Sequence, residues 1–218
     1  MSEAVSIDVY SDVVCPWCYI GKRKLEQALV RLREHNVVVT PSWRAFQLNP
    51  DMPAAGMARK DYVEAKFDGP ERAREIYARV AAAGNEVGIP FQFEKIERQP
   101  NTINAHRLIR LAGDHGRQDA VAEALFRAFF LELRDIGDIN ELSEVAVVAG
   151  LERDAVFSYL SSDQGAELVR QEDAVARQLG ITGVPFFVFA GKYAVSGAQG
   201  ADVLVQAYGE AASEITTN

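Results

Sequence analysis

Both cysteines of this 218-residue chain fall within Ser11-Asp12-Val13-Val14-Cys15-Pro16-Trp17-Cys18-Tyr19, directly after a short apolar segment. From Val5 to Tyr10 apolar and polar side chains alternate, which is the period of a half-buried strand. Pro16 suits the first turn of a helix, where the N–H that proline lacks has no partner. Leucine and alanine then recur at helical spacing. The stretch is therefore predicted to be a strand-to-helix junction that carries the cysteine pair.

The same kind of pattern predicts the elements on either side of a long helical block. Residues 37–46 are rich in β-branched and aromatic side chains, and Pro41 indicates an edge strand or a broken one. Residues 5–48 are thus predicted to form a βαβ unit. Helical spacing then recurs between glycines, near 60–87, 102–115, 118–134, 140–149 and 153–161, with Phe91-Gln92-Phe93 as a short extended segment.

The last part of the chain returns to a mixed pattern. A helix over 164–179 is predicted to end at Gly180, a typical residue just past a helix C-terminus. Two strands are predicted over 181–189 and 192–196, and a helix from about residue 201. The order is therefore β-α-β, helical block, α-β-β-α.

Composition excludes several broad classes of function. Hydrophobic residues make up 48% and charged residues 25% of the chain, as in ordinary globular proteins. The formal net charge is −8, so nucleic acid and anionic membrane surfaces are not expected partners. There is no apolar run of about 18 residues that would span a bilayer. Residues 1–8 lack the basic and apolar regions of a secretory signal, and we expect a cytoplasmic protein.

The position of the cysteines predicts their chemistry. Cys15 is expected to be exposed at a helix N-terminus, where free N–H groups and the helix dipole stabilise a thiolate. Cys18 lies one turn deeper, so Cys15 is predicted to attack and Cys18 to resolve the mixed disulfide. Two unreactive buried thiols are the bland alternative. A structural zinc site is another, but it needs more ligands, and the histidines have no matching spacing (His35, His106 and His115).

Several segments in the same order along the chain carry a family resemblance. Besides 11–19 they are Arg44-Ala45-Phe46-Gln47-Leu48-Asn49-Pro50, Asn101-Thr102-Ile103-Asn104-Ala105-His106-Arg107-Leu108, Leu125-Phe126-Arg127-Ala128-Phe129-Phe130, Gly180-Ile181-Thr182-Gly183-Val184-Pro185-Phe186-Phe187 and Val195-Ser196-Gly197-Ala198-Gln199. Together they resemble the DsbA family, and more narrowly its cytoplasmic FrnE branch.

The resemblance implies an α/β architecture: a thioredoxin-like fold with a large all-helical insertion. The thioredoxin-like domain would comprise residues 1–50 and 162–218, and the inserted helical domain residues 51–161. The implied activity is thiol–disulfide oxidoreduction through a Cys-Pro-Trp-Cys dithiol. In thioredoxin-like folds a Val-Pro loop packs beside the cysteines and offers backbone groups to an extended substrate. Substrate binding is therefore assigned to Pro16, Trp17, Val184 and Pro185.

The same resemblance sets the expected partners and the rival functions. No cofactor or metal is expected beyond the Cys15–Cys18 pair, with glutathione as a candidate reductant and protein or small thiols and disulfides as substrates. One rival is a glutathione-dependent isomerase of the 2-hydroxychromene-2-carboxylate type, or a kappa-class glutathione transferase; these share the layout but typically place serine where Cys15 stands. The other rival is a redox-linked, chaperone-like binding protein that uses the helical block.

A few other side chains have both a structural and a functional interpretation. Asp12 either caps the helix or perturbs the reactive cysteine, and capping is favoured. His106 is expected on a helix surface or at a domain contact rather than in catalysis. Trp17 either shapes substrate access or covers the helix end. The aromatic residues Phe126, Phe129 and Phe130 are predicted to be core.

Overall fold

The structure is a computed structural model that describes residues 5–217. The chain begins with strand β1 (Ile7–Ser11), helix α1 (Pro16–Glu34) and strand β2 (Ser42–Ala45). It ends with helix α8 (Ala166–Gln178), the hairpin of β5 (Phe186–Phe189) and β6 (Tyr193–Ser196), and helix α9 (Ala201–Thr217). Between them lie β3 (Met57–Ala58), α2 (Arg59–Phe67), α3 (Pro70–Glu86), the short 3₁₀ helix η1 (Phe93–Lys95), β4 (Arg98–Gln99), α4 (Ile103–Gly113), α5 (Gln118–Phe130), α6 (Ile139–Val148) and α7 (Arg153–Leu160).

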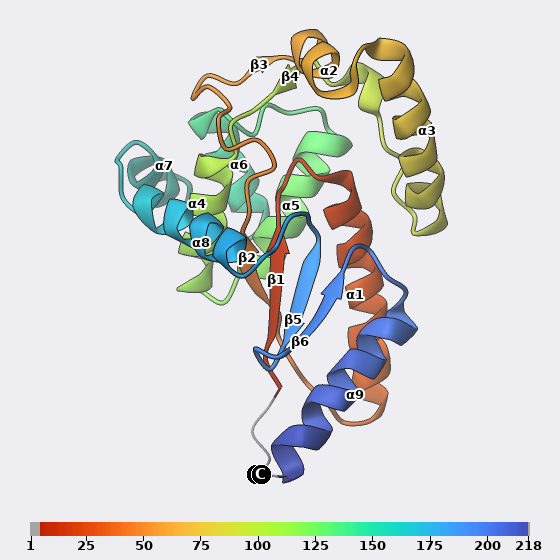
Figure 1. Cartoon of the computed structure of the whole chain (residues 1–218). Helices are drawn as coiled ribbons and strands as arrows, with labels where there is room; N and C mark the ends of the chain where they lie inside the picture. The colour runs from red at the N-terminus through yellow and green to blue at the C-terminus, as the bar shows by residue number, and fades with distance from the viewer. Residues whose placement is uncertain (1–4, 218) are drawn as a thin grey trace.

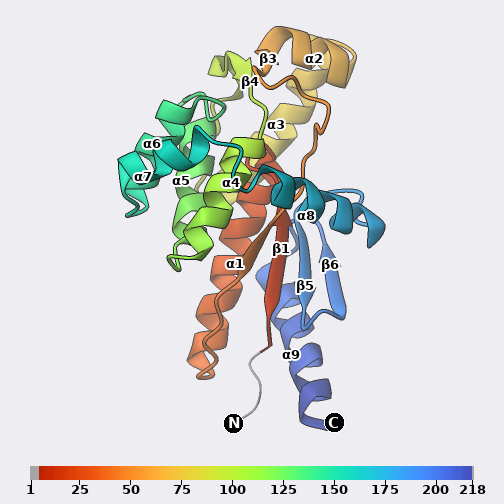
Figure 2. The ribbon, with the colours of Figure 1, turned by 90° about the vertical axis from the view of Figure 1, so that its left-hand side faces the viewer.

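A four-stranded sheet organises the molecule, in the order β2-β1-β5-β6. Strand β2 is parallel to β1, with Val9 opposite Trp43, whereas β5 is antiparallel to β1, with Val9 opposite Phe187. The predicted βαβ unit is therefore confirmed, and β2 is an edge strand, one of the two outcomes that Pro41 indicated. Helices α1 and α9 pack against each other beside the sheet, and the helical insertion lies around its other end (Figures 1 and 2). The thioredoxin-like fold with a helical insertion is confirmed.

One hydrophobic cluster runs from the sheet through α1 into the insertion. Phe126, Phe129 and Phe130 of α5 are at most 1% exposed, which confirms them as core. Tyr19 of α1 stacks on Phe126 with ring centroids 5.0 Å apart, so the cysteine-bearing helix is packed directly on the insertion. The division into residues 1–50 with 162–218 and an inserted domain over 51–161 stays a prediction.

Local backbone geometry alters some of the predicted elements. The segment near 60–87 is helical as predicted but is divided into two helices, because the chain takes positive φ at Asp68 (59°) and Gly69 (110°) before Pro70 starts α3. Phe91-Gln92-Phe93 is not a strand; η1 begins there instead. The two-residue strands β3 and β4 pair with each other and are too short to leave a periodic pattern. Within residues 5–217 no helix is both long and apolar enough to cross a bilayer.

A buried charge fastens α1 to α5. The Lys22 side chain is 2% exposed, and its ammonium group forms ion pairs with Glu26, with Asp119 at 3.2 Å and with Glu123 at 3.5 Å. Burial opposes the charge, but the three carboxylates outweigh burial and raise the pKa of Lys22. The α1–α5 contact therefore depends on a cation that has left water and is held by three acceptors.

We expect Lys22→Met to lower the free energy of unfolding by about 1–3 kcal/mol, because the carboxylates at the α1–α5 contact lose their cation. The matched control is Arg31→Met on the same helix. Arg31 is half-exposed and pairs with the exposed Asp202, so its loss should change stability by less than about 0.5 kcal/mol. Urea unfolding of both variants measures the difference. Equal losses would show that Lys22 is no more important than a surface charge.

Candidate active site

The cysteine pair lies at the junction that the sequence predicted. Cys15 is the N-cap of α1, with extended φ and ψ of −91° and 111°, and Pro16 begins the helix. The Cys15 N–H donates to the Asp12 carbonyl at 3.0 Å, and the Cys15 carbonyl accepts from the Cys18 N–H at 3.0 Å. These backbone bonds place Cys18 one turn into the helix and fix the two sulfurs on neighbouring turns.

A loop from the far end of the chain completes the site. The Cys15 thiol donates to the Val184 carbonyl at 3.5 Å, and the Val184–Pro185 peptide bond is cis. The turn after β6 holds this loop, because the Gly197 N–H donates to the Pro185 carbonyl at 2.8 Å. The same turn also holds α1, since the Lys24 ammonium donates to the Ala198 carbonyl at 2.8 Å. The Ser196–Gln199 segment thus joins the loop to the cysteine-bearing helix through hydrogen bonds.

Both sulfurs belong to buried residues. Cys15 is 4% exposed and Cys18 is 1% exposed, and both are free thiols. The prediction that Cys15 is exposed was therefore wrong for this dithiol form, because the Val184 loop closes over it. Burial raises the pKa of Cys18 well above its usual value, and the neighbouring Cys15 adds to this. Hydrogen bonds from the Ser11 side chain and the Asp12 backbone lower the pKa of Cys18, but by less than burial raises it.

The predicted substrate-binding residues divide into two groups. Val184 and Pro185 lie against the cysteines, as described above. Trp17, between the cysteines in sequence, is 41% exposed. Pro16 is partly buried in the first turn of α1. The structure places these residues around Cys15; their binding roles stay predictions.

Asp12 does not cap α1. Its carboxylate accepts from the Leu48 N–H at 2.8 Å, and its other oxygen faces His106 Nε2 at 3.4 Å. The capping interpretation was wrong because the bend of the chain at Val13 and Val14 leaves Cys15 itself as the N-cap. His106 is 3% exposed and faces Asp12, so of its two expected places the helix surface is wrong, and the domain contact stays a prediction with the domain division.

Tyr62 of α2 is a site residue that the sequence did not reveal. It is 9% exposed, and burial raises its pKa, with smaller contributions from the nearby Asp12 and Cys15. The guanidinium group of Arg59 lies over its ring at 5.2 Å. Since Tyr62 is far from the cysteines in sequence and sits in a mostly polar helix, no local pattern could have assigned it to the site.

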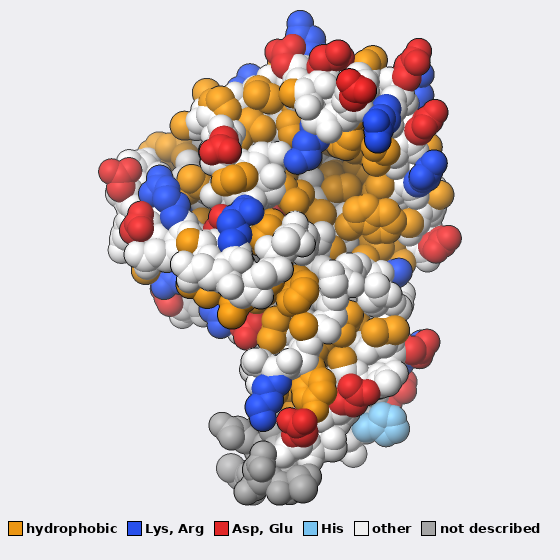
Figure 3. Space-filling view, in the orientation of Figure 1, with side chains coloured by type: hydrophobic (Ala, Val, Ile, Leu, Met, Phe, Trp, Pro, Cys, Tyr) orange, Lys and Arg blue, Asp and Glu red, His pale blue; other side chains and the backbone are white. Residues whose placement is uncertain are grey.

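An apolar groove adjoins the cysteine-bearing helix. It has a volume of about 1080 Å³ between α2, α3 and η1. Figure 3 shows apolar side chains around the hollow on this face of the molecule. One wall is Phe91, whose ring lies edge-on to Tyr19 with centroids 6.1 Å apart. The groove therefore contacts the cysteine-bearing helix through Phe91 and Tyr19.

The fold and this site define a thioredoxin-like protein with its cysteine pair at the first strand-to-helix junction. The chain belongs to the DSBA-like thioredoxin domain family, whose sequence profile matches residues 6–209.

Individual relatives agree with the family assignment. A Streptomyces coelicolor protein described as a "probable DsbA oxidoreductase" has a solved structure that is similar at 34% identity and a TM-score of 0.87, over 96% of this chain and 91% of that one. YwbO of Bacillus subtilis (strain 168), an uncharacterized protein, is 29% identical over 204 residues, which are 93% of this chain and 95% of YwbO. The cytosolic disulfide reductase DsbM of Pseudomonas aeruginosa, solved with glutathione, shares the fold at 15% identity and a TM-score of 0.62, over 97% of this chain and 98% of that one.

Close packing between α1 and the Pro185 loop gives a test of the site. A methyl group on Gly21 would lie 2.8 Å from Pro185 Cγ, so Gly21→Ala must push the loop away from α1. We expect it to lower the free energy of unfolding by about 1–3 kcal/mol. The control is Gly209→Ala in α9, where nothing lies within 4 Å, and it should stabilise by up to about 1 kcal/mol. Chemical denaturation compares the two, and a Gly21→Ala variant as stable as Gly209→Ala would contradict the contact.

Proposed function

We propose that the protein is a thiol–disulfide oxidoreductase of the FrnE branch of the DsbA family, with Cys15 as nucleophile and Cys18 as resolving thiol. The observation that carries the proposal is the hydrogen bond from Cys15 to the Val184 carbonyl at 3.5 Å. It brings a cysteine at a helix N-terminus to the backbone of a loop 169 residues away. A pair of thiols with no reaction to perform does not require such an arrangement.

The reaction exchanges one disulfide for another. The Cys15 thiolate attacks a substrate disulfide, forms a Cys15–substrate bond and releases one substrate thiolate. Cys18 then attacks the Cys15 sulfur, the Cys15–Cys18 bond forms, and the second substrate thiolate leaves. The dithiol loses two electrons and the substrate disulfide gains them. Run backwards, the same steps oxidise a substrate dithiol.

Protein substrates fit the surroundings of Cys15. An extended segment can add to the loop as a strand, with a substrate N–H donating to the Val184 carbonyl that Cys15 now uses. The apolar groove beside α1 has room for side chains of that segment, and the side chain of Trp17 is exposed. Pro185 offers no N–H to compete for the substrate.

The dithiol itself stores the two electrons, and the proposal needs no organic cofactor or metal. Glutathione is proposed as a small-molecule reductant, supported by the shared fold with DsbM, which was solved with glutathione. We propose the cytoplasm as the compartment, where thiols are kept reduced and a Cys-x-x-Cys pair serves catalysis rather than structure.

Disulfide exchange is favoured over the two other functions considered. A glutathione-dependent isomerase or transferase needs one activated group and leaves Cys18 without a role, although its sulfur lies one turn below Cys15. A purely chaperone-like protein would use the groove but would not need the Cys15–Val184 contact. Groove variants that lose polypeptide binding but keep thiol exchange would show that the chaperone-like function and disulfide exchange are separate.

We expect iodoacetamide to label Cys15 before Cys18 in the reduced protein. The reason is that Cys18 is the more deeply buried residue and burial raises the pKa of its thiol. Brief labelling near neutral pH followed by peptide mass mapping gives the order. Faster labelling of Cys18 would reverse the assigned roles.

The two cysteines should also differ on substitution. Cys18→Ala is expected to accumulate mixed disulfides with protein substrates, because the covalent intermediate loses its intramolecular exit. Cys15→Ala should abolish insulin reduction and trap nothing. Non-reducing gels and an insulin turbidity assay report both effects, with wild type as control. If both variants retained insulin reduction, the proposed function would be wrong.

A further inference from the structure

Helix α1 contacts both the loop before β5 and the turn after β6 from one face. Gly21 packs on Pro185 of the loop, since a methyl group on Gly21 would lie 2.8 Å from Pro185 Cγ. Lys24 is three residues further along α1 and is therefore a neighbour of Gly21 on the helix surface. Its ammonium group donates to the Ala198 carbonyl of the turn at 2.8 Å. The helix that carries the cysteines is thus tied to both backbone segments.

The turn that Lys24 contacts also holds the loop. The Gly197 N–H donates to the Pro185 carbonyl at 2.8 Å, and the Gln199 N–H donates to the Gly197 carbonyl at 2.9 Å. Gly197 has a φ of 80°, a conformation that favours glycine, so the turn is tight. Because the Ala198 carbonyl lies within this turn, a shift of that carbonyl would be passed on to Pro185 through the Gly197 N–H.

The Pro185 carbonyl is one peptide unit away from the group that faces the reactive sulfur. The Val184 carbonyl accepts from the Cys15 thiol at 3.5 Å, and in the proposed reaction a substrate N–H takes the place of that thiol. An N–H···O bond needs a donor–acceptor distance of about 2.7–3.2 Å. The position of the Val184 carbonyl therefore decides whether an extended segment can bind while its disulfide reaches Cys15.

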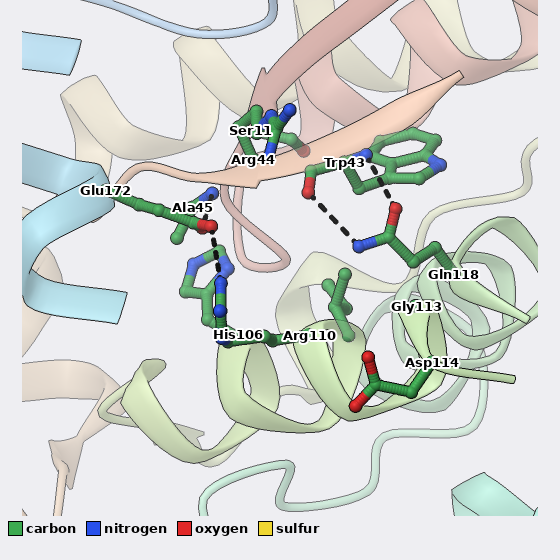
Figure 4. Close-up of a pocket in the computed structure, with 11 residues that line it drawn as sticks. Ser11, Trp43, Arg44, Ala45, His106, Arg110, Gly113, Asp114, Gln118 and Glu172 are labelled. Atoms are coloured by element: carbon green, nitrogen blue, oxygen red, sulfur yellow. Dashed lines mark hydrogen bonds and ion pairs between the residues drawn. The ribbon is translucent and has the colours of Figure 1, made fainter. Parts of the chain in front are cut away.

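The β2 edge of the sheet does not offer an alternative place for an added strand. The Trp43 N–H donates to Gln118 Oε1 at 3.2 Å. The Ala45 N–H donates to Glu172 Oε2, also at 3.2 Å. Figure 4 shows Gln118 and Glu172 reaching this edge from the helices beside it. These side chains occupy the backbone donors that an added strand would use, so we expect an extended substrate at the Val184 loop and not at β2.

We propose that Lys24 is a positioning residue for protein substrates, because its bond to the Ala198 carbonyl fixes the Val184 carbonyl at which an extended segment docks. This inference rests on the proposed function and adds a residue that determines the affinity for such segments. Lys24 forms no bond to the substrate and takes no part in breaking or forming disulfides. A small disulfide without a peptide backbone should therefore react at the same rate whether or not the Lys24 ammonium group is present.

The test compares two disulfides that differ in their backbone. Insulin presents its disulfides within a polypeptide, whereas DTNB is a small aromatic disulfide with no backbone N–H to donate. Reduced protein is mixed with an excess of either one in a single turnover. Alkylation and mass spectrometry follow formation of the Cys15–Cys18 disulfide over a range of insulin concentrations. Absorbance of the released aromatic thiolate follows the reaction with DTNB.

The variants separate the hydrogen bond from the charge. Lys24→Met removes the donor but keeps a long side chain of high helix propensity. Lys24→Gln is a second variant, whose amide nitrogen is one atom nearer the backbone than the ammonium group. Lys24→Arg retains a cationic donor. The matched control is Lys192→Met, which removes the same charge next to β6, where Lys192 is exposed and pairs with the half-exposed Glu214 at 3.4 Å.

We expect Lys24→Met and Lys24→Gln to raise the half-saturating insulin concentration by about tenfold, the effect of losing one hydrogen bond to a charged group. The maximal rate should stay within about twofold of wild type, as for a change that acts on binding alone. The rate with DTNB should be unchanged. Lys24→Arg and Lys192→Met should match wild type with both disulfides.

Three results would overturn the role of Lys24. They are an unchanged insulin dependence in Lys24→Met and Lys24→Gln, an equal loss of rate with insulin and DTNB, and a Lys192→Met variant as impaired as Lys24→Met. A wild-type protein that reacts with DTNB but not with insulin would show that no extended segment docks, and the inference would fail while dithiol exchange stood. A wild-type protein that forms the Cys15–Cys18 disulfide with neither reagent would instead refute the proposed function.

Discussion

The hydrogen bond between the Cys15 thiol and the Val184 carbonyl is the constraint on which the rest of the site depends. It requires the N-terminus of α1 and the loop before β5 to meet, and the two are 169 residues apart in sequence. Strand pairing brings them close, since β1 lies directly between β2 and β5. The Ser196–Gln199 turn then fixes the distance by bonding to both the Pro185 carbonyl and Lys24.

The two thiols differ in burial, which supports the unequal roles proposed for them. Burial of Cys18 raises the pKa of its thiol and so favours the protonated form. Cys15, at the N-terminus of α1, is 4% exposed and contacts the Val184 carbonyl. The insertion supplies what the sheet lacks, namely His106 opposite Asp12 and the groove beside α1. The helical insertion thus provides a buried partner for Asp12 and an apolar groove on the same side of the molecule.

Local pattern was enough to predict the sheet and the cysteine junction. Alternation in β1, Pro16 at a helix start and the glycine-punctuated helices each depend on near neighbours, so they can be predicted from the sequence. The burial of Cys15 depends on the Val184 loop, and the Asp12–His106 contact depends on α4, so both depend on packing between residues far apart in the sequence. No local sequence pattern of about ten residues encodes that packing. The break between α2 and α3 has a different cause, since Asp68 adopts positive φ, which residues other than glycine seldom favour.

The proposed function requires Cys15 and Cys18 to form a reversible two-electron couple. The protein is equilibrated in glutathione buffers of graded redox potential and quenched with an alkylating reagent. Mass spectrometry of the products then measures the redox potential of the couple directly. Only two species of the protein are expected, the dithiol and the Cys15–Cys18 disulfide. The fraction of disulfide should vary with redox potential as expected for a two-electron couple. Its midpoint should lie above about −300 mV, the upper limit typical of structural disulfides. A protein that never forms the internal disulfide, or one that remains oxidised well below that potential, would contradict the proposed function.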